Sequence, residues 1–395
     1  MATGRAGAEA DAPERIAAAV QAHRDEILAL AHAIHEDPEG GFDEVRASAR
    51  VADVLRRAGF AVEHPAGSLA TAVRARLTGA RPGPTVAILA EYDALRGLGH
   101  GCGHNVISGA GVGAVLALAA LRDELPGEVV FLGTPAEEDL AGKQVMLDDG
   151  LFAGVDAAMM IHPSNQTQVE MELLASIDAE VTFSGLQAHA STDPWNGRNA
   201  LDALILLFGS VGLWRQQLRP DARVHGIVVD GGTAVNIIPS RAVGHFRIRT
   251  SDGAYHAALQ ARFAEMVRAA ELAAGCTSEL RWFARADTMR HNGAMGERFA
   301  ANLARLGIAD GPLSPRVGSS DIGNVSQVMP TIHPMLAIVD GPVPLHSVAF
   351  REAARTERAD DTIIAGATCL AQTAWELLSE PGLLEAARAE FAGKG

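Results

Sequence analysis

The first half of the chain alternates stretches of helical periodicity with short apolar runs. Apolar residues recur at helical spacing from about residue 13 to 35 and again from about 44 to 57. Later helix-length stretches separate near-continuous apolar runs, which are typical of strands buried on both faces: VAILA at 86–90, VVFLG at 129–133 and AAMMI at 157–161. Strands that alternate with helices in this way predict an α/β layer with a mixed, largely parallel sheet.

The pattern changes near residue 175 and changes back near 287. Residues 176–187 and the runs at 222–232 and 241–250 alternate apolar and polar positions, and helical spacing returns at 197–218 and 254–274. After residue 287 the α/β pattern resumes, with a strand at 331–339 and a closing helix at 360–378. We therefore expect an α/β domain in two segments, 13–176 and 288–395, interrupted by an inserted α+β domain at 177–287. Residues 1–12 are small, polar and charged, and we expect them to be disordered.

Composition and charge exclude several classes of protein. With 48 acidic against 33 basic residues, the net charge of −15 disfavours a nucleic-acid partner. Three cysteines among 395 residues exclude a disulfide framework and indicate a reducing compartment. The N-terminal residues lack the apolar segment of a secretory signal, and the most apolar run, 105–120, is short and glycine-rich for a membrane span. The expectation is a cytoplasmic protein without a membrane partner.

The segment RGLGHGCGHN at 96–105 carries the first candidate chemistry. Cys102 and His104 follow a strand and a loop, and helix-forming sequence begins at about Asn105. Thiolate and imidazole are both good ligands for a borderline ion such as Zn²⁺. A Cys-x-His pair by itself is weak evidence, because a buried thiol beside a hydrogen-bonded histidine is the more common explanation of such a pair.

Further polar residues follow other apolar strands. Glu137 and Glu138, in TPAEED, leave a buried strand, which is costly unless a positive group awaits them; an ordinary helix start is the alternative. His162 ends the run AMMI, where a hydrogen-bonded core histidine is the simpler interpretation, and His346 lies in the loop VPLHS.

The combination is more informative than any member. Cys102, His104, the two glutamates and His162 are all expected at strand-to-helix exits, the edge at which open α/β sheets place their sites. One thiolate, three imidazoles and carboxylates suit two neighbouring divalent ions. Asp93, just after VAILAEY, fits as a hydrogen-bond acceptor for a ligand histidine.

Six segments together resemble a known family. EYDALRGLGHGCGHN, GTPAEED, IHP, GLQAHASTDPWNGRNALDA, GGTAVNIIP and PLHS follow in this order within residues 28–380. They resemble the M20 family of metallopeptidases and amidohydrolases, in its cysteine-containing branch, and most closely the aminoacylase-1-like-2 group of dipeptidases and aminobenzoyl-glutamate hydrolases. The resemblance implies a zinc-peptidase-like catalytic domain and an inserted lid or dimerisation domain.

The resemblance also implies roles for individual residues. One or two divalent ions (Zn²⁺, Mn²⁺ or Co²⁺) would be held by a set of five ligands: Cys102, His104, Glu138, His162 and His346. Glu137 would be the general base. His189 would reach a neighbouring subunit's site and stabilise the oxyanion, which implies a homodimer through the inserted domain. Asn236 and Arg249 would bind a substrate carboxylate. The family's usual His-x-Asp stretch is Glu91-Tyr92-Asp93 here, which leaves the occupancy of the second metal position open.

The expected activity is hydrolysis of the amide bond of an N-acyl amino acid or dipeptide with a free carboxylate, by water that the metal activates. Hydrolytic deamination of an aromatic amino acid, nucleophilic catalysis by Cys102 and a non-catalytic scaffold are the alternatives. Some residues keep no assigned role. His100 is interpreted as part of the glycine-rich loop and Lys143 as structural, whereas Asp321 or His333 is expected to line the pocket. Cys276 and Cys369 are expected to be inert core thiols.

Overall fold

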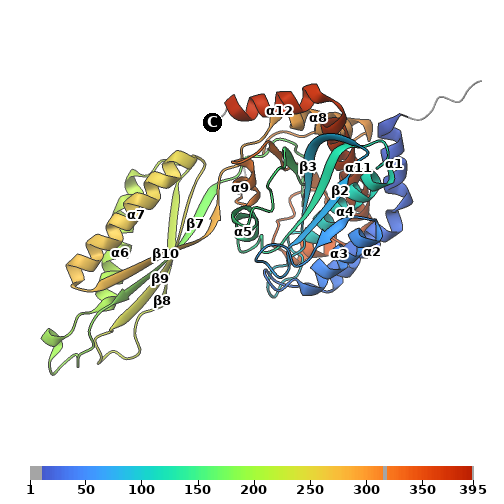
Figure 1. Ribbon diagram of the computed structural model, residues 1–395. Coiled ribbons are helices and arrows are strands. Elements are labelled where there is room, and N and C mark those ends of the chain that lie inside the picture. Colours follow the sequence, from blue (N-terminus) through green and yellow to red (C-terminus); the bar gives the residue numbers. More distant parts are fainter. Residues whose placement is uncertain (1–10, 315–317, 394–395) are drawn as a thin grey trace, which may run out of the picture. The chain divides into compact units, whose positions relative to one another are not determined.

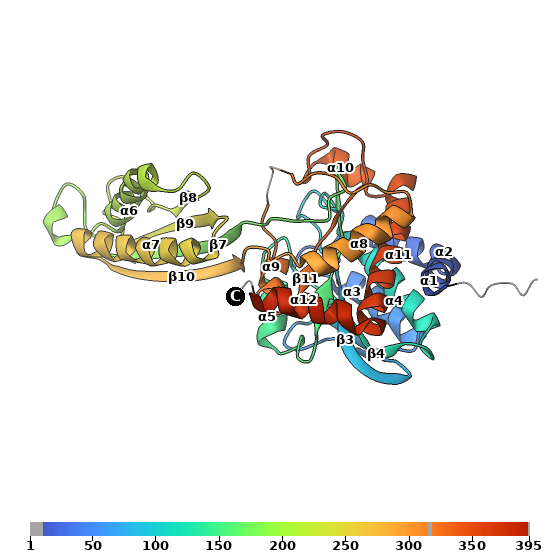
Figure 2. The same cartoon turned by 90° about the horizontal axis from the view of Figure 1, so that it is seen from above.

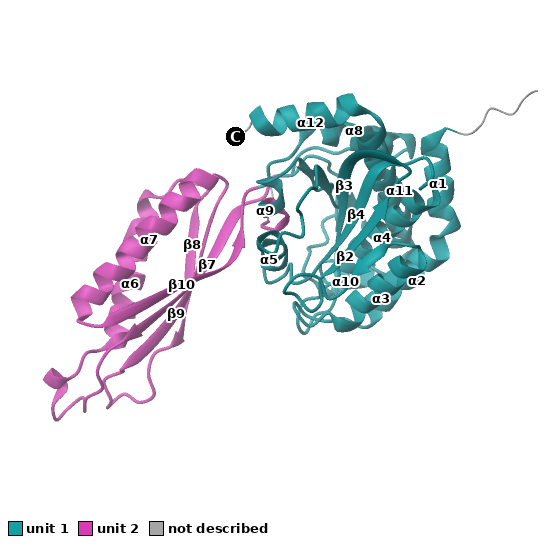
Figure 3. Ribbon diagram, viewed as in Figure 1, with its two compact units in different colours: residues 1–171, 289–316, 324–395 teal, residues 172–288, 317–323 magenta. Residues whose placement is uncertain are grey.

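The computed structural model describes residues 11–314 and 318–393, so the expectation of a disordered N-terminus lies outside the described residues at positions 1–10. The chain divides into two compact units (Figure 3): unit 1 comprises residues 1–171, 289–316 and 324–395, and unit 2 comprises 172–288 and 317–323. The predicted inserted segment 177–287 lies within unit 2. Its role as a lid or dimerisation domain stays a prediction.

Unit 1 is built on a mixed six-stranded sheet with the order β1-β2-β4-β3-β5-β11. The β1–β2 and β2–β4 pairs are antiparallel, and the β4–β3, β3–β5 and β5–β11 pairs are parallel. The strands are β1 (Ala61–Glu63), β2 (Val73–Thr78), β3 (Arg81–Glu91), β4 (Pro126–Thr134), β5 (Ala157–Met159) and β11 (Thr331–Ile332). Shortly after β5 and β11 the same two segments of the chain pair again, as the short parallel strands β6 (His162–Ser164) and β12 (Met335–Ala337).

Two long helices of unit 1, α4 (His104–Ala120) and α11 (Glu357–Ser379), pack against each other and against β3 and β4 (Figures 1 and 2). Residues 104–118 of α4 are all buried, which explains why its sequence is apolar on every face. Within the described ranges, every helix is too short or too polar to cross a bilayer. The other helices of unit 1 are α1 (Ala12–Ala22), α2 (Arg24–Glu36), α3 (Val45–Arg57), α5 (Gly142–Asp148), α8 (Gly293–Arg305), α9 (Ile322–Ser326, shared with unit 2), α10 (Val348–Ala353) and α12 (Pro381–Gly393).

Unit 2 is an antiparallel four-stranded sheet, β10-β7-β9-β8, with two long helices. Alternate residues of β7, such as Val181 and Phe183, are buried against the helices, and the residues between them face the helix-free side of the sheet. The elements are β7 (Ala175–Ser184), α6 (Ala200–Trp214), β8 (Arg223–Asp230), β9 (Arg241–Thr250), α7 (Gly253–Ala274) and β10 (Thr277–Ala286), with short 3₁₀ turns at Pro194–Asn196 and Arg215–Gln217.

The structure differs from the sequence-based elements at several positions. The helical stretch 13–35 is two helices, because the chain breaks at His23. The strand expected at 331–339 is split into β11 and β12, and the elements β10, α8 and α12 were not predicted. The α/β class with a mixed, mostly parallel sheet is confirmed.

Candidate metal centre

Cys102 and His104 enter the site at the start of α4. Gly103 between them has φ +79°, and a Cβ at this position would lie 2.7 Å from Pro163 Cγ. Glycine is therefore required for the sharp turn that places the thiol before the helix and the imidazole in its first turn. The thiol is 6% exposed, and the imidazole is fully buried.

The paired glutamates lie on a turn of unusual backbone geometry between β4 and α5. Ala136 and Leu140, on either side of the pair, both have positive φ, at 56° and 50°. The buried Glu44 accepts a hydrogen bond from the Ala136 N–H at 2.7 Å. Non-glycine residues adopt this conformation only where the surroundings enforce it, and such positions concentrate at functional sites.

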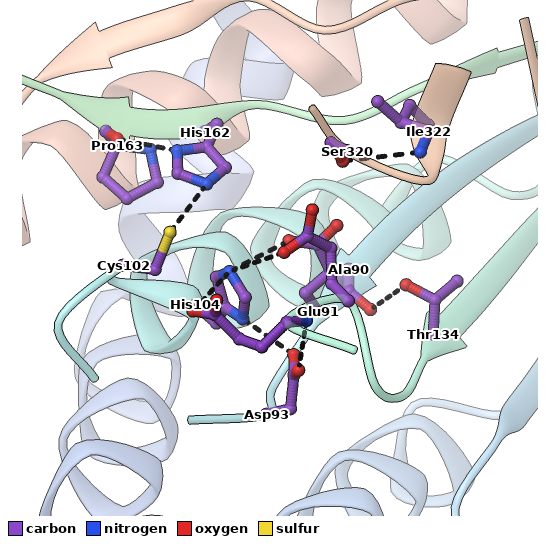
Figure 4. Close-up of polar contacts among 12 residues, drawn as sticks. Ala90, Glu91, Asp93, Cys102, His104, Thr134, His162, Pro163, Ser320 and Ile322 are labelled. Carbon is purple, nitrogen blue, oxygen red and sulfur yellow. Dashed lines mark hydrogen bonds and ion pairs between the residues drawn. The ribbon is translucent and has the colours of Figure 1, made fainter. Parts of the chain in front are cut away.

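The two buried histidines are fixed in the tautomer that a metal ligand needs. His104 Nδ1 lies 2.7 Å from Asp93 Oδ1, and His162 Nδ1 lies 2.7 Å from the Pro163 carbonyl. Both partners only accept, so both Nδ1 atoms donate, and both Nε2 atoms face the site, where an ion would bind them (Figure 4). Asp93 also accepts from the Glu138 N–H at 2.9 Å.

His162 departs from its expected place in the fold. It begins the short strand β6 and does not lie at a strand-to-helix exit, because the chain stays extended after β5 and pairs with β12. His346 lies in the loop before α10 with φ +59°, and its backbone N–H donates to the Gly101 carbonyl at 2.8 Å. The loop that carries His346 is thereby tied to the loop that carries Cys102.

The five predicted ligands form two groups that share Cys102. In the first group Cys102, His104 and His162 offer ligand atoms within 4.8 Å of one another, and in the second Cys102, Glu138 and His346 do so. Ligand atoms of a tetrahedral zinc ion lie about 3.4 Å apart, or about 3.6 Å when one is sulfur. The observed separations are 3.5 Å from Cys102 Sγ to His162 Nε2 and 3.6 Å from His346 Nε2 to Glu138 Oε2. The donor set therefore fits divalent ions.

The protonation of the site in the metal-free protein is consistent with this fit. Burial raises the pKa of the Cys102 thiol far above its ordinary value and that of Glu138 to about 7, and it lowers the pKa of His162 to about 4. His104 Nε2 and Glu138 Oε1 are buried without a hydrogen-bond partner among the described residues. A divalent ion would satisfy both atoms and would replace the thiol proton.

Two buried residues of the site have no role in the sequence-based analysis. Glu91, the last residue of β3, is fully buried, and its Oε1 accepts from Lys143 Nζ at 2.5 Å. Its Oε2 lies 3.4 Å from His104 Nε2, and Glu91, His104 and Glu137 form a third group of ligand atoms within 4.8 Å. A carboxylate that ends the buried run VAILA was the available signal for Glu91. Nothing in the sequence indicated that Lys143 would meet it.

The predicted residues of unit 2 do not come together in one place. The loops that carry His189 and Asn236 are paired, since the Ala190 N–H donates to the Asn236 carbonyl at 3.0 Å. Both loops lie at the end of the sheet where Ser184 pairs with Arg241. Arg249 lies eight residues further along β9, at the opposite end, which corresponds to about 26 Å. A dipeptide, whose backbone spans roughly 7 Å at most, could not contact both ends of one sheet.

His189 and Arg249 have the hydrogen-bonding state that their predicted roles require. The backbone N–H groups of Ser191 and Thr192 both lie 3.3 Å from His189 Nδ1, which must therefore accept. A neutral ring then carries its proton on Nε2 and can donate it to an oxygen atom. Arg249 is half-buried, and its Nε has no hydrogen-bond partner among the described residues.

Comparison with known proteins gives one consistent answer. Residues 85–376 match the model of peptidase family M20/M25/M40. The chain is 35% identical to the human Xaa-Arg dipeptidase, over 95% of this chain and 91% of the relative. It is 29% identical to one of the subunits of p-aminobenzoyl-glutamate hydrolase from Escherichia coli K12, over 80% of this chain and 68% of the relative. Its fold is similar to that of the Bacillus subtilis protein YXEP, a dinuclear metal-binding peptidase, with a TM-score of 0.67 at 23% identity, covering 90% of this chain and 99% of that one.

Proposed function

The chain belongs to peptidase family M20/M25/M40, and from that membership we propose that it hydrolyses the peptide bond of a dipeptide with a free C-terminal carboxylate. Similarity to a dipeptidase named for C-terminal arginine supports a basic second residue as the first substrate class to test. The surplus of acidic residues favours cationic over anionic substrates. The single observation that carries the proposal is the gathering of five predicted ligands, distant in sequence, into two groups that share Cys102.

We infer that the five ligands hold two divalent ions, one in each group. Ions bound there would polarise the scissile carbonyl and make a water molecule acidic enough to attack it at neutral pH. The thiolate favours Zn²⁺, whereas the carboxylates also accept Mn²⁺. Asp93 orients His104 through the Nδ1 hydrogen bond.

Glu137 is the proposed general base. The residue is 7% exposed, and its Oε2 lies 3.8 Å from His104 Nε2, beside the ligand groups. In this role Glu137 takes a proton from the attacking water and delivers it to the leaving nitrogen, which departs as the amine of the released amino acid.

The residues of unit 2 would bind the substrate from two copies of the chain. Because the loops of His189 and Asn236 lie at the Arg241 end of β9, and Arg241 and Arg249 are about 26 Å apart along this strand, we propose that one copy supplies Arg249 and a second copy supplies the other two. Arg249 would pair with the terminal carboxylate, and His189 Nε2–H would donate to the developing oxyanion.

A homodimer through unit 2 is therefore part of the proposal. Strand β8 is an edge strand, and it exposes three consecutive apolar side chains, Ile227, Val228 and Val229, which are 64%, 53% and 52% exposed. An apolar edge strand of this kind favours pairing with another chain. Helix α6 exposes further apolar residues, among them Ile205 and Leu213.

The decisive experiment combines metal analysis with a substrate panel. Protein purified without chelator is analysed for bound metals and is then assayed by amine release on Ala-Arg, Ala-Lys, Ala-Glu, p-aminobenzoyl-glutamate and N-acetylcysteine. We expect about two ions per chain and fastest turnover of the basic dipeptides. Exhaustive chelation should abolish activity, and Zn²⁺ or Mn²⁺ should restore it. Release of ammonia, or full activity in the chelated protein, would overturn the proposal.

A further inference from the structure

The buried carboxylate of Glu91 is placed as if to bind a cation. One of its oxygens, Oε1, accepts from Lys143 at 2.5 Å, and the other, Oε2, has no hydrogen-bond partner among the described residues. Both side chains of this ion pair are fully buried. A buried ion pair is stabilising only when its remaining polar atoms are also satisfied, and here one oxygen is left over.

The group that faces this oxygen is itself a metal-ligand atom. Glu91 Oε2 lies 3.4 Å from His104 Nε2, and Figure 4 shows the two side chains directed toward each other. Since Nδ1–H donates to Asp93, Nε2 is the ring atom that faces the carboxylate oxygen, and neither of these two buried atoms has a hydrogen-bond partner among the described residues. A divalent ion between them would satisfy both. Their separation equals the value of about 3.4 Å for two ligands of one tetrahedral ion.

We propose that Glu91 is a further metal ligand in this chain, which binds through Oε2 the same ion as His104. Lys143 is then a positioning residue: it occupies Oε1, so that the carboxylate binds the ion through one oxygen only. The inference rests on the proposed function, since it concerns one of the two ions of that site.

The test measures metal affinity and does not depend on turnover. Metal-free wild type and Glu91→Gln are titrated with Zn²⁺ and with Mn²⁺ against a chromophoric chelator, and bound metal is counted by mass spectrometry. We expect Glu91→Gln to lose ~100-fold or more in affinity for one ion, beyond the effect of an outer hydrogen-bond partner, and to keep the other ion. Glu128→Gln, which removes a carboxylate paired with Arg76 in the same sheet, is the matched control and should bind both ions as wild type does.

Variants of Lys143 distinguish a Glu91 that binds metal from a Glu91 that only forms an ion pair with Lys143. If Glu91 served only to pair with Lys143, Lys143→Met and Glu91→Gln would affect metal binding alike. We expect Lys143→Met to keep both ions while lowering the melting temperature of the metal-free protein, because Glu91 is then buried without its cation. Since Glu91→Gln leaves the lysine charge buried, the double variant Glu91→Gln/Lys143→Met is measured in parallel and should show the same loss of one ion.

Each outcome tests either the role of Glu91 or the proposed function, and not both. Wild-type affinity for both ions in Glu91→Gln and in the double variant would overturn the role of Glu91. Equal losses in Glu91→Gln and Lys143→Met would overturn it as well and leave a structural ion pair. A wild-type protein that binds no divalent ion would instead overturn the proposed function.

Discussion

Among the individual side chains, the two adjacent glutamates divide ligand and base between them in the proposed mechanism. Replacing Glu137 by Gln keeps the shape of the side chain and removes its ability to take a proton. We expect kcat/KM to fall by at least ~100-fold on the best dipeptide, with both ions retained, as measured by steady-state kinetics and metal analysis. Asp139→Asn, one position beyond the pair, is the control and should stay close to wild type. Loss of an ion in Glu137→Gln would make Glu137 a ligand.

Sequence reasoning could single out residues where a motif carried them, and it could not do so where two residues meet only in the folded chain. Cys102 and His104 are two positions apart, and their chemistry is visible in the motif itself. The meeting of Glu91 with Lys143, 52 positions later, depends on the path of the chain from β3 to α5. The distance between Asn236 and Arg249 depends on strand register, which a list of motif residues does not contain.

At the scale of elements, the turn into α4 is the most sensitive part of the site. Gly103→Ala introduces a Cβ 2.7 Å from Pro163 at φ +79°, so the turn must shift. We expect a loss of about 1–3 kcal/mol in stability and weaker metal binding, measured by thermal denaturation and chelator competition. Gly382→Ala, in α12 of the same unit, meets nothing within 4 Å, so it should leave metal binding unchanged and should not lower stability. Unchanged metal affinity in Gly103→Ala would show that the turn does not position the ligands.

Glu44, which precedes α3 and binds the turn that carries Glu137 and Glu138, is expected to make stability depend on pH. Burial, reinforced by Asp93, raises the pKa of Glu44 to about 7 from an ordinary value of 4.5. The folded state then keeps a proton that the unfolded chain has already lost, so stability falls by about 3 kcal/mol as pH rises from about 4.5 to about 7. Glu44→Gln should flatten this decline in melting temperature, recorded in chelated protein.

A control keeps this pH prediction specific. Glu63→Gln, at an exposed position of β1, should leave the pH profile of the melting temperature unchanged. An identical profile in wild type and Glu44→Gln would show that the carboxyl of Glu44 does not carry the dependence.

The accuracy of the predicted elements follows the strength of each pattern. The apolar runs of β3 and β4 and the alternation of β7 and β9 are strong patterns, and the structure has strands at all four places. Strand β10 (TSELRWFARA) begins with three polar residues and its apolar residues do not alternate strictly, so it was easy to miss. The break at His23 separates two helices whose apolar faces continue each other's spacing, and periodicity alone does not reveal it.

For the whole molecule, the central prediction is a site shared between two copies. Glu137→Gln and His189→Ala should each be nearly inactive. When the two are co-expressed with different affinity tags and the mixed dimer is purified, one of its two sites has both residues intact. We expect about half of the wild-type kcat per dimer, because a two-fold dimer exchanges the same surface in both directions.

Arg249 supplies the matched control for the shared site. We propose that Arg249 acts with the metal centre of its own copy, so a mixed dimer of Arg249→Ala and Glu137→Gln should be inactive at both of its sites. An inactive mixed dimer of Glu137→Gln and His189→Ala, confirmed as a dimer by light scattering, would contradict the contribution of His189 from the second copy.

The length of the sheet in unit 2 has a consequence for the protein at low abundance. If His189 and Arg249 must come from different molecules, a chain that has just left the ribosome is folded but inert until it meets another of its kind. Dilution then inactivates the enzyme, and specific activity should decline steeply below the dissociation constant of the dimer.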